Sequence, residues 1–232
     1  ILSRSLNVEG VRSGMSRNDI AQAQFYFVDA CRVQSPVLSN YQHLQEGLTL
    51  DSRLGEAVGC SAYFASAAPA TYAYAALRGT SLFLQALLQC LELHAVSPSD
   101  GGEWIVTTTS LFRALTERVR EVAAEHNALQ EAVCGGMLGD DVVIHAPNSP
   151  PVIPTTLSVA PDAAVPVAWA DLFDGETSEA IFEAERFAPD ISRDVPAGVH
   201  RLQVRISPAT PPYRDRQLAI AMMPPAYTKR VS

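Results

Sequence analysis

The chain has 232 residues, of which 47% are hydrophobic and 18% charged, and its formal net charge is −8. This composition is typical of a globular protein with a sizeable core, organised as one large domain or as a domain with a smaller module. The negative charge and the lack of a basic stripe argue against nucleic acid as a partner. No apolar run approaches ~20 residues, so we expect no membrane span.

The four cysteines, at positions 31, 60, 90 and 134, have no CxxC partner and no nearby histidine. This spacing excludes a familiar zinc site, and we expect neither a metal nor a cofactor. Apolar neighbours indicate reduced thiols, so the expected location is the cytoplasm. No signal peptide is visible, but the chain begins at Ile1 rather than Met, so we expect the natural N-terminus to lie outside it.

The segment Phe25–Arg32 opens with three aromatic residues and a valine, which predicts a central strand of a covered sheet. Apolar side chains stop at Asp29, and Cys31 and Arg32 follow. Open α/β sheets place their chemistry at the carboxyl ends of such strands. The alternative is a core strand that ends in a buried cysteine and a solvated arginine.

Residues 32–59 are polar and show no sustained periodicity, which is typical of a functional or mobile loop. A second short strand is predicted over Ser61–Ser66, followed by the small-residue loop Ala67–Gly79. Thr80 or Ser81 then caps a helix whose apolar residues recur with the helical period.

A second helix is predicted to be capped by Thr109 or Ser110, after a short extended piece at Trp104–Thr107. Its charged residues form a solvated outer surface, and Val142–His145 is the last strand of this first unit. The inner face of the helix is expected to carry Leu111, Phe112, Leu115, Val119 and Val122.

Four prolines between positions 147 and 154 mark a boundary by composition. Beyond it, alternating apolar and polar residues predict a half-exposed antiparallel sheet, with a helix inserted at Glu176–Phe187. The strands of this β-rich part are predicted at Thr155–Val159, Val165–Trp169, His200–Ile206 and Gln217–Met223.

Two sequence blocks resemble the caspase-like cysteine peptidases. The tetrad Asp29–Arg32 reads Asp-Ala-Cys-Arg, which is similar to Gln-Ala-Cys-Arg in caspases and to Asp-x-Cys-His in metacaspases. Ser66–Pro69 followed by Gly79–Leu87 resembles the family's Ser-Thr-Ala-Pro-Gly turn and its Gly-Ser-Trp-Phe-Ile-Gln helix start. The helix from Leu111 to Val119 is also similar to the family's Leu-Thr-Arg-Val-Asn helix, and the resemblance covers roughly residues 1–130.

The resemblance implies an α/β fold, namely an α/β/α sandwich around a mostly parallel sheet, with the N-terminal strands missing from this chain. Cys31 would then be a thiolate nucleophile that attacks a peptide carbonyl and forms an acyl-enzyme. Backbone amides, that of Cys31 among them, would bind the oxyanion.

The family's histidine lies about 50 residues upstream of the cysteine, but only 30 residues precede Cys31, and no His-Gly dipeptide occurs. We interpret the five histidines, at positions 43, 94, 126, 145 and 200, as structural or surface residues. The chain therefore looks like the C-terminal product of a split or processed precursor, whose N-terminal fragment would supply the imidazole. The alternative is a catalytically inactive scaffold or protein-interaction module.

The resemblance also predicts where a substrate would bind. The caspase arginine that reads an aspartate side chain aligns within Ala73-Tyr74-Ala75, where Ala75 replaces it. Asp29 instead matches the acidic residue that metacaspases place two before the cysteine, in a pocket for Arg or Lys. A buried carboxylate there would favour a basic side chain, so we expect cleavage after Arg or Lys. Arg32 is not expected to neutralise it, because its side chain points to the opposite face.

The expected substrate-binding residues are Asp29, Ser66, Ala73, Tyr74 and Ala75, with Tyr74 as a wall of the groove. Residues 1–146 would form the C-terminal part of the peptidase domain, 147–154 a proline-rich linker, and 155–232 a β-rich accessory module for recognition or regulation. By family analogy, the alanine-rich composition suggests a prokaryotic effector of stress or defence that acts on protein or peptide substrates.

Overall fold

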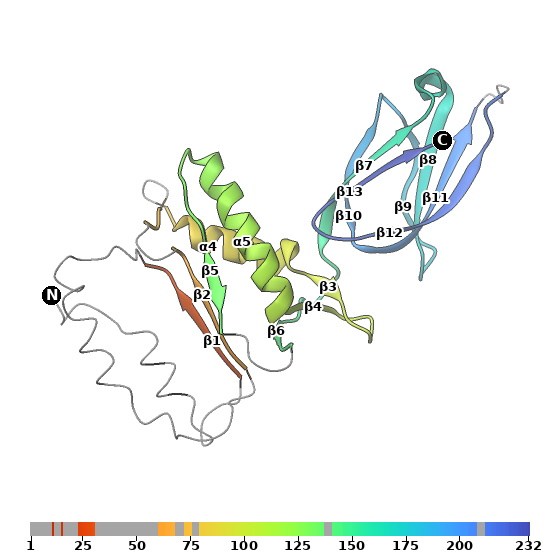
Figure 1. The fold of residues 1–232 in the computed structure, drawn as a ribbon. Helices are drawn as coiled ribbons and strands as arrows, with labels where there is room; N and C mark the ends of the chain where they lie inside the picture. The colour runs from red at the N-terminus through yellow and green to blue at the C-terminus, as the bar shows by residue number, and fades with distance from the viewer. Residues whose placement is uncertain are drawn as a thin grey trace. The chain divides into compact units, whose positions relative to one another are not determined.

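Residues 11, 15, 23–30, 60–67, 72–75, 79–136, 141–207 and 212–232 are described by the computed structural model of the chain (Figure 1). The chain divides into two units. The first comprises Ile1–Leu91 and Val106–Ile144, and the second Glu92–Ile105 and His145–Ser232. The predicted loop 32–59, with Cys31, Arg32 and His43, lies outside the described residues. No helix among the described residues is both long and apolar enough to cross a membrane.

The first unit contains a sheet of strands β1 (Ala23–Val28), β2 (Cys60–Ala65) and β5 (Val133–Gly135), in the order β1-β2-β5. β1 and β2 run parallel, and β5 is antiparallel to β2, so the described sheet combines one parallel and one antiparallel pair. The expectation of a central, fully covered β1 is wrong for the described sheet. β1 is its edge strand, and Phe27 is 42% exposed even though its ring stacks on Phe64 with centroids 5.1 Å apart.

Two helices pack against each other in this unit, α4 (Leu82–Gln89) and α5 (Thr108–Glu125). A π-helical turn, η2 (Cys90–His94), extends α4. Ser81 caps α4 as predicted, whereas α5 begins earlier than expected, because the capping box uses Thr107 and places Ser110 three residues inside the helix. The predicted inner face of α5 is largely confirmed, since Leu111, Leu115, Val119 and Val122 are buried and Phe112 is half-buried.

A further small sheet has the order β3-β4-β6, with β3 at Ser97–Pro98, β4 at Trp104–Thr107 and β6 at Val143–His145. β4 and β6 coincide with the extended segments predicted from the sequence. Thr108 joins α5 to the segment before β6, because its amide donates to the carbonyl of Val142 at 2.9 Å.

The second unit contains a β-sandwich of two sheets that share one buried core. One sheet has the order β10-β7-β13, with strands Ile191–Pro196, Val152–Val159 and Tyr227–Val231. The other has the order β12-β11-β8-β9, with strands Arg216–Met222, Gly198–Ile206, Ala168–Asp174 and Ala180–Arg186. A 3-10 helix, η3 (Asp162–Val167), connects β7 to β8, so the strand predicted from Val165 begins at Ala168.

The helix expected at Glu176–Phe187 is wrong, because this segment forms β9. Phe182 pairs with Leu172 on β8, and Phe187 is buried in the core. Ala184 has a φ of 53°, at a point where the ladder to β8 is irregular. The helical spacing of small residues was a local signal, and cross-strand packing overrides it.

β7 begins at Val152, inside the range 147–154 that the sequence analysis assigned to a linker, and it continues through Pro154. β13 starts its parallel pairing with β7 at Thr155, so Pro154 has a neighbouring strand on one side only. A proline that lacks an N–H is tolerated where one side of a strand is unpaired.

Candidate functional site

The carboxyl ends of β1 and β2 are held together by one serine. The amide of Ser66 donates to the carbonyl of Val28 at 2.8 Å, which continues the parallel ladder past β2. Its hydroxyl accepts from the Ala30 amide at 2.9 Å and donates to the Ala30 carbonyl at 3.1 Å. Ser66 is fully buried. Both polar groups of the residue directly before Cys31 are therefore fixed by a side chain 36 positions away in sequence.

Ser66 was expected to contact a substrate, but its side chain is buried against Ala30. A hydroxyl with no exposed surface positions the end of β1 rather than facing a ligand. Cys31 itself lies outside the described residues. The structure therefore describes the residue that leads into it and the contacts that hold this residue.

Asp29 lies at the N-terminus of α4. The Ser81 hydroxyl donates a hydrogen bond to Asp29 Oδ2 and accepts one from the amide of Leu84 at 3.0 Å, so Ser81 caps the helix and holds the carboxylate at once. A negative charge is favoured at a helix N-terminus. Asp29 is exposed, so the expectation of a buried carboxylate is wrong. The strand ends at Val28, and the residue that follows it is open to solvent.

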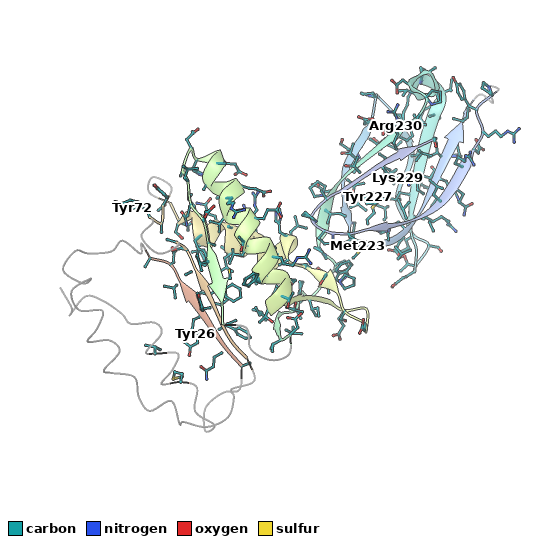
Figure 2. All side chains as sticks on the ribbon, viewed as in Figure 1. Tyr26, Tyr72, Met223, Tyr227, Lys229 and Arg230 are labelled. Carbon is teal, nitrogen blue, oxygen red and sulfur yellow. The ribbon has the colours of Figure 1, made fainter. Side chains whose placement is uncertain are left out.

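The segment Tyr72–Ala75 runs beside the start of α4. The Tyr74 carbonyl accepts from the Leu82 amide at 2.9 Å, and Ala75 forms an isolated antiparallel bridge with Ser81. The hydrogen bond between Leu82 and Tyr74 lies next to the Ala75–Ser81 pair, so Ala75 and Ser81 do not bond each other. The N–H and C=O of Ala75 therefore point away from Ser81, toward the other edge of the segment. Tyr72, whose side chain is labelled in Figure 2, is exposed on the surface, and so is Tyr74. Their exposed fractions are 57% and 40%. The predicted groove residues thus form a short extended segment whose aromatic side chains reach solvent.

Gln130 joins these parts, and the sequence analysis missed it. Its side-chain amide donates to the Ser66 carbonyl at 2.8 Å, and its side-chain oxygen accepts from the Tyr74 amide at 2.9 Å. The residue is only 3% exposed, in the stretch between α5 and β5. It therefore fixes the distance between the end of β2 and the groove segment. A lone glutamine in an irregular stretch gives no sequence signal, because its partners lie 64 and 56 positions away.

The described thiols of the first unit are not nucleophiles at neutral pH. Burial raises the pKa of Cys90 to about 12 and that of Cys134 to about 11. A thiol reacts as its thiolate, so both remain protonated and inert. The side chain of Cys60 and the whole of Cys31 lie outside the described residues, so the structure says nothing about the pKa of either thiol.

The described histidines serve other contacts. His126 Nδ1 lies 2.9 Å from the Val122 carbonyl at the end of α5, and His200 Nε2 lies 2.8 Å from the Pro196 carbonyl in the sandwich. His145 is exposed at the end of β6. Within the described residues, the contacts of Asp29, Ala30 and Ser66 involve no histidine.

The arrangement thus offers a fixed strand end before a cysteine, an exposed carboxylate beside it, and an extended segment alongside. The sequence matches no protein-family model and no curated protein, and the structure matches no solved structure.

Proposed function

We propose that this chain is the C-terminal part of a caspase-like cysteine endopeptidase in which Cys31 is the nucleophile. One observation carries the proposal most strongly: the Ser66 hydroxyl holds both backbone groups of Ala30 at the carboxyl ends of two parallel strands. A nucleophile gains rate from being held in one geometry, and a fixed strand end supplies that geometry for the next residue. The motif at Asp29–Arg32 then gives this position its chemistry.

In this proposal, the Cys31 sulfur attacks the carbonyl carbon of the scissile peptide bond. A histidine from the upstream part of the precursor takes the thiol proton and passes it to the leaving amine. Water then breaks the thioester, which releases the new carboxylate and restores the thiol. Support for an upstream partner comes from β1, which is an edge strand of the described sheet and can accept further strands there.

For substrate choice, the proposal assigns Asp29 to a basic side chain before the cleaved bond. The carboxylate is exposed and anchored through one oxygen by Ser81, and Ser81 is bridged to Ala75 of the groove segment. The residues at 73 and 75 are alanines with small side chains, and the edge of Ala75 can pair with an extended peptide. An arginine at this place would form charge-assisted hydrogen bonds with the carboxylate.

A catalytically inactive scaffold is the second candidate, and it is favoured by the histidine-free contacts of the described site. Turnover of peptides that present Arg, Lys, Asp or Ala before the cleaved bond, by the precursor that includes residues upstream of Ile1, separates the two. We expect cleavage after Arg and Lys that is lost in Cys31→Ala and kept in a Cys60→Ala control. Binding of these peptides without turnover would favour the scaffold, and a preference for Asp would refute the role of Asp29.

A further inference from the structure

The β-sandwich has a cavity of about 370 Å³ at the end where β7 and β13 finish and β12 begins. Its walls come from both sheets. Val159 and Val231 are paired neighbours in one sheet, and Val204 and Arg216 are paired neighbours in the other. The hollow therefore lies between the sheets, and its size is within the range of small-molecule sites.

The floor of this end cavity is apolar. Four residues of the floor, Val159, Ala164, Val204 and Val231, are 6%, 2%, 2% and 3% exposed and belong to the shared core of the sandwich. An apolar group that enters would displace water from this surface and gain the free energy of hydrophobic burial. The volume equals the share of roughly twelve water molecules, which suits a chain or ring of modest size.

The rim of the cavity carries two arginines. Arg214 and Arg216 line it and are exposed, and Ser232 also belongs to the lining. Asp215, between the two arginines, is exposed and accepts from the amide of the lining residue Ile206 at 2.8 Å. Among the described residues, neither arginine has an ion pair or a ring contact. The other described arginines of the sandwich do have partners. Arg193, Arg205 and Arg230 pair with Glu185, Asp171 and Asp162 at 2.7, 2.6 and 2.7 Å, Arg186 donates to the Pro166 carbonyl, and Arg201 lies over the Phe173 ring.

We propose that this cavity binds a small amphipathic carboxylate, with its apolar tail between the sheets and its carboxylate on Arg214 and Arg216. Guanidinium groups match carboxylate geometry through paired N–H donors, and they lose less hydration free energy on pairing than an ammonium does. The apolar floor would bind the tail of such a molecule, and the two guanidinium groups at the opening would bind its carboxylate. The inference concerns the sandwich alone and stands or falls independently of the proposed peptidase.

Titration calorimetry of the whole chain with octanoate tests the inference, and octyltrimethylammonium serves as a ligand of equal length and opposite charge. We expect saturable one-site binding of octanoate that tightens roughly fourfold for each added methylene. The double variant R214Q/R216Q should bind octanoate roughly tenfold more weakly or worse, since it loses hydrogen bonds to a charged group. The matched control R193Q removes a guanidinium that is already paired with Glu185 outside the cavity, and it should leave binding unchanged.

Three results would overturn the proposal: no saturable octanoate binding to the unaltered chain, equal affinity in R214Q/R216Q, or equally tight binding of octyltrimethylammonium. Both arginines are exposed, so the glutamine substitutions should leave the sandwich folded. The fluorescence of the two tryptophans, Trp104 on β4 and Trp169 on β8, verifies this in the same samples.

Discussion

Replacing Gln130 by Met should loosen the first unit while leaving the second intact. Methionine keeps a similar length and flexibility but removes both polar contacts, so the Ser66 carbonyl and the Tyr74 amide lose their partners. Ser66 is fully buried, and an unsatisfied buried carbonyl costs about 1–3 kcal/mol. The hydrogen bond of the Tyr74 amide is only part-buried, so the cost there is about 0.5–1 kcal/mol. The expected total is about 1.5–4 kcal/mol.

Urea unfolding measures this cost, and the two units carry separate signals. Far-UV circular dichroism follows α4 and α5 in the first unit, whereas both tryptophans, Trp104 and Trp169, lie in the second. We expect the midpoint of the helical signal to fall by about 1 M or more at an unchanged slope, with tryptophan fluorescence unaltered.

The matched control is Gln85→Met, because Gln85 is a half-buried residue of α4 whose side chain donates to the carbonyl of the exposed Thr80 at 3.1 Å. Its expected cost is within about 0.5 kcal/mol. If Gln130→Met lowers the helical midpoint no more than Gln85→Met does, the bridging role of Gln130 is refuted.

Three further predictions concern charge and protonation. Desolvation raises the pKa of Asp141, but the hydrogen bonds that its carboxylate accepts from Thr108 Oγ1 at 2.6 Å and from the Thr109 amide at 2.9 Å outweigh this effect and hold the pKa below the usual range. Asp141→Asn keeps an accepting oxygen and loses the charge at the N-terminus of α5, so it should cost about 0.3–1 kcal/mol at neutral pH. The difference from the unaltered chain should shrink in urea titrations as the pH falls below about 4 and vanish below the lowered pKa of the folded state. Burial raises the pKa values of Cys90 and Cys134 to about 12 and 11. The unfolded chain therefore loses these two thiol protons first as the pH rises above about 9, and the free energy of unfolding should fall by roughly 1.4 kcal/mol per pH unit for each thiol. The same slope in a Cys90→Ala/Cys134→Ala variant would contradict this prediction. In the proposed peptidase, Asp29→Asn should lower kcat/KM for peptides cleaved after Arg by roughly 10- to 100-fold, the loss of hydrogen bonds to a charged group, whereas Asp100→Asn, in an exposed turn of the other unit, should leave it unchanged.

Local patterns in the sequence predicted the elements that depend on local physics. The aromatic run at Phe25–Val28 formed a strand, and Ser81 capped α4 through the Leu84 amide. The same reasoning failed at Glu176–Phe187, where spacing suited a helix but pairing with β8 determined the structure. Side-chain periodicity describes one element at a time, so it cannot anticipate which distant strand will cover it.

The candidate site shows the same division more sharply. The motifs in the sequence pointed to Asp29 and Ser66. Asp29 was expected to be buried but is exposed, and Ser66 was expected to contact substrate but instead bonds to Ala30. Gln130 gave no signal, since its role depends on two backbone groups brought to it by the fold. Contacts between residues so far apart in the sequence follow from tertiary packing, so they can be seen only in the folded structure.

Covalent labelling shows whether Cys31 is the nucleophile of the proposed peptidase. The precursor that includes residues upstream of Ile1 would be treated with a peptidyl acyloxymethyl ketone that presents Arg before the reactive carbon, and the labelled peptide would be identified by mass spectrometry. A thiolate displaces the acyloxy group and forms a stable thioether with this reagent. We expect a single saturable adduct on Cys31, and a peptide substrate with Arg before the cleaved bond should compete with its formation. An adduct on Cys60, or no saturable adduct on any cysteine, would contradict it.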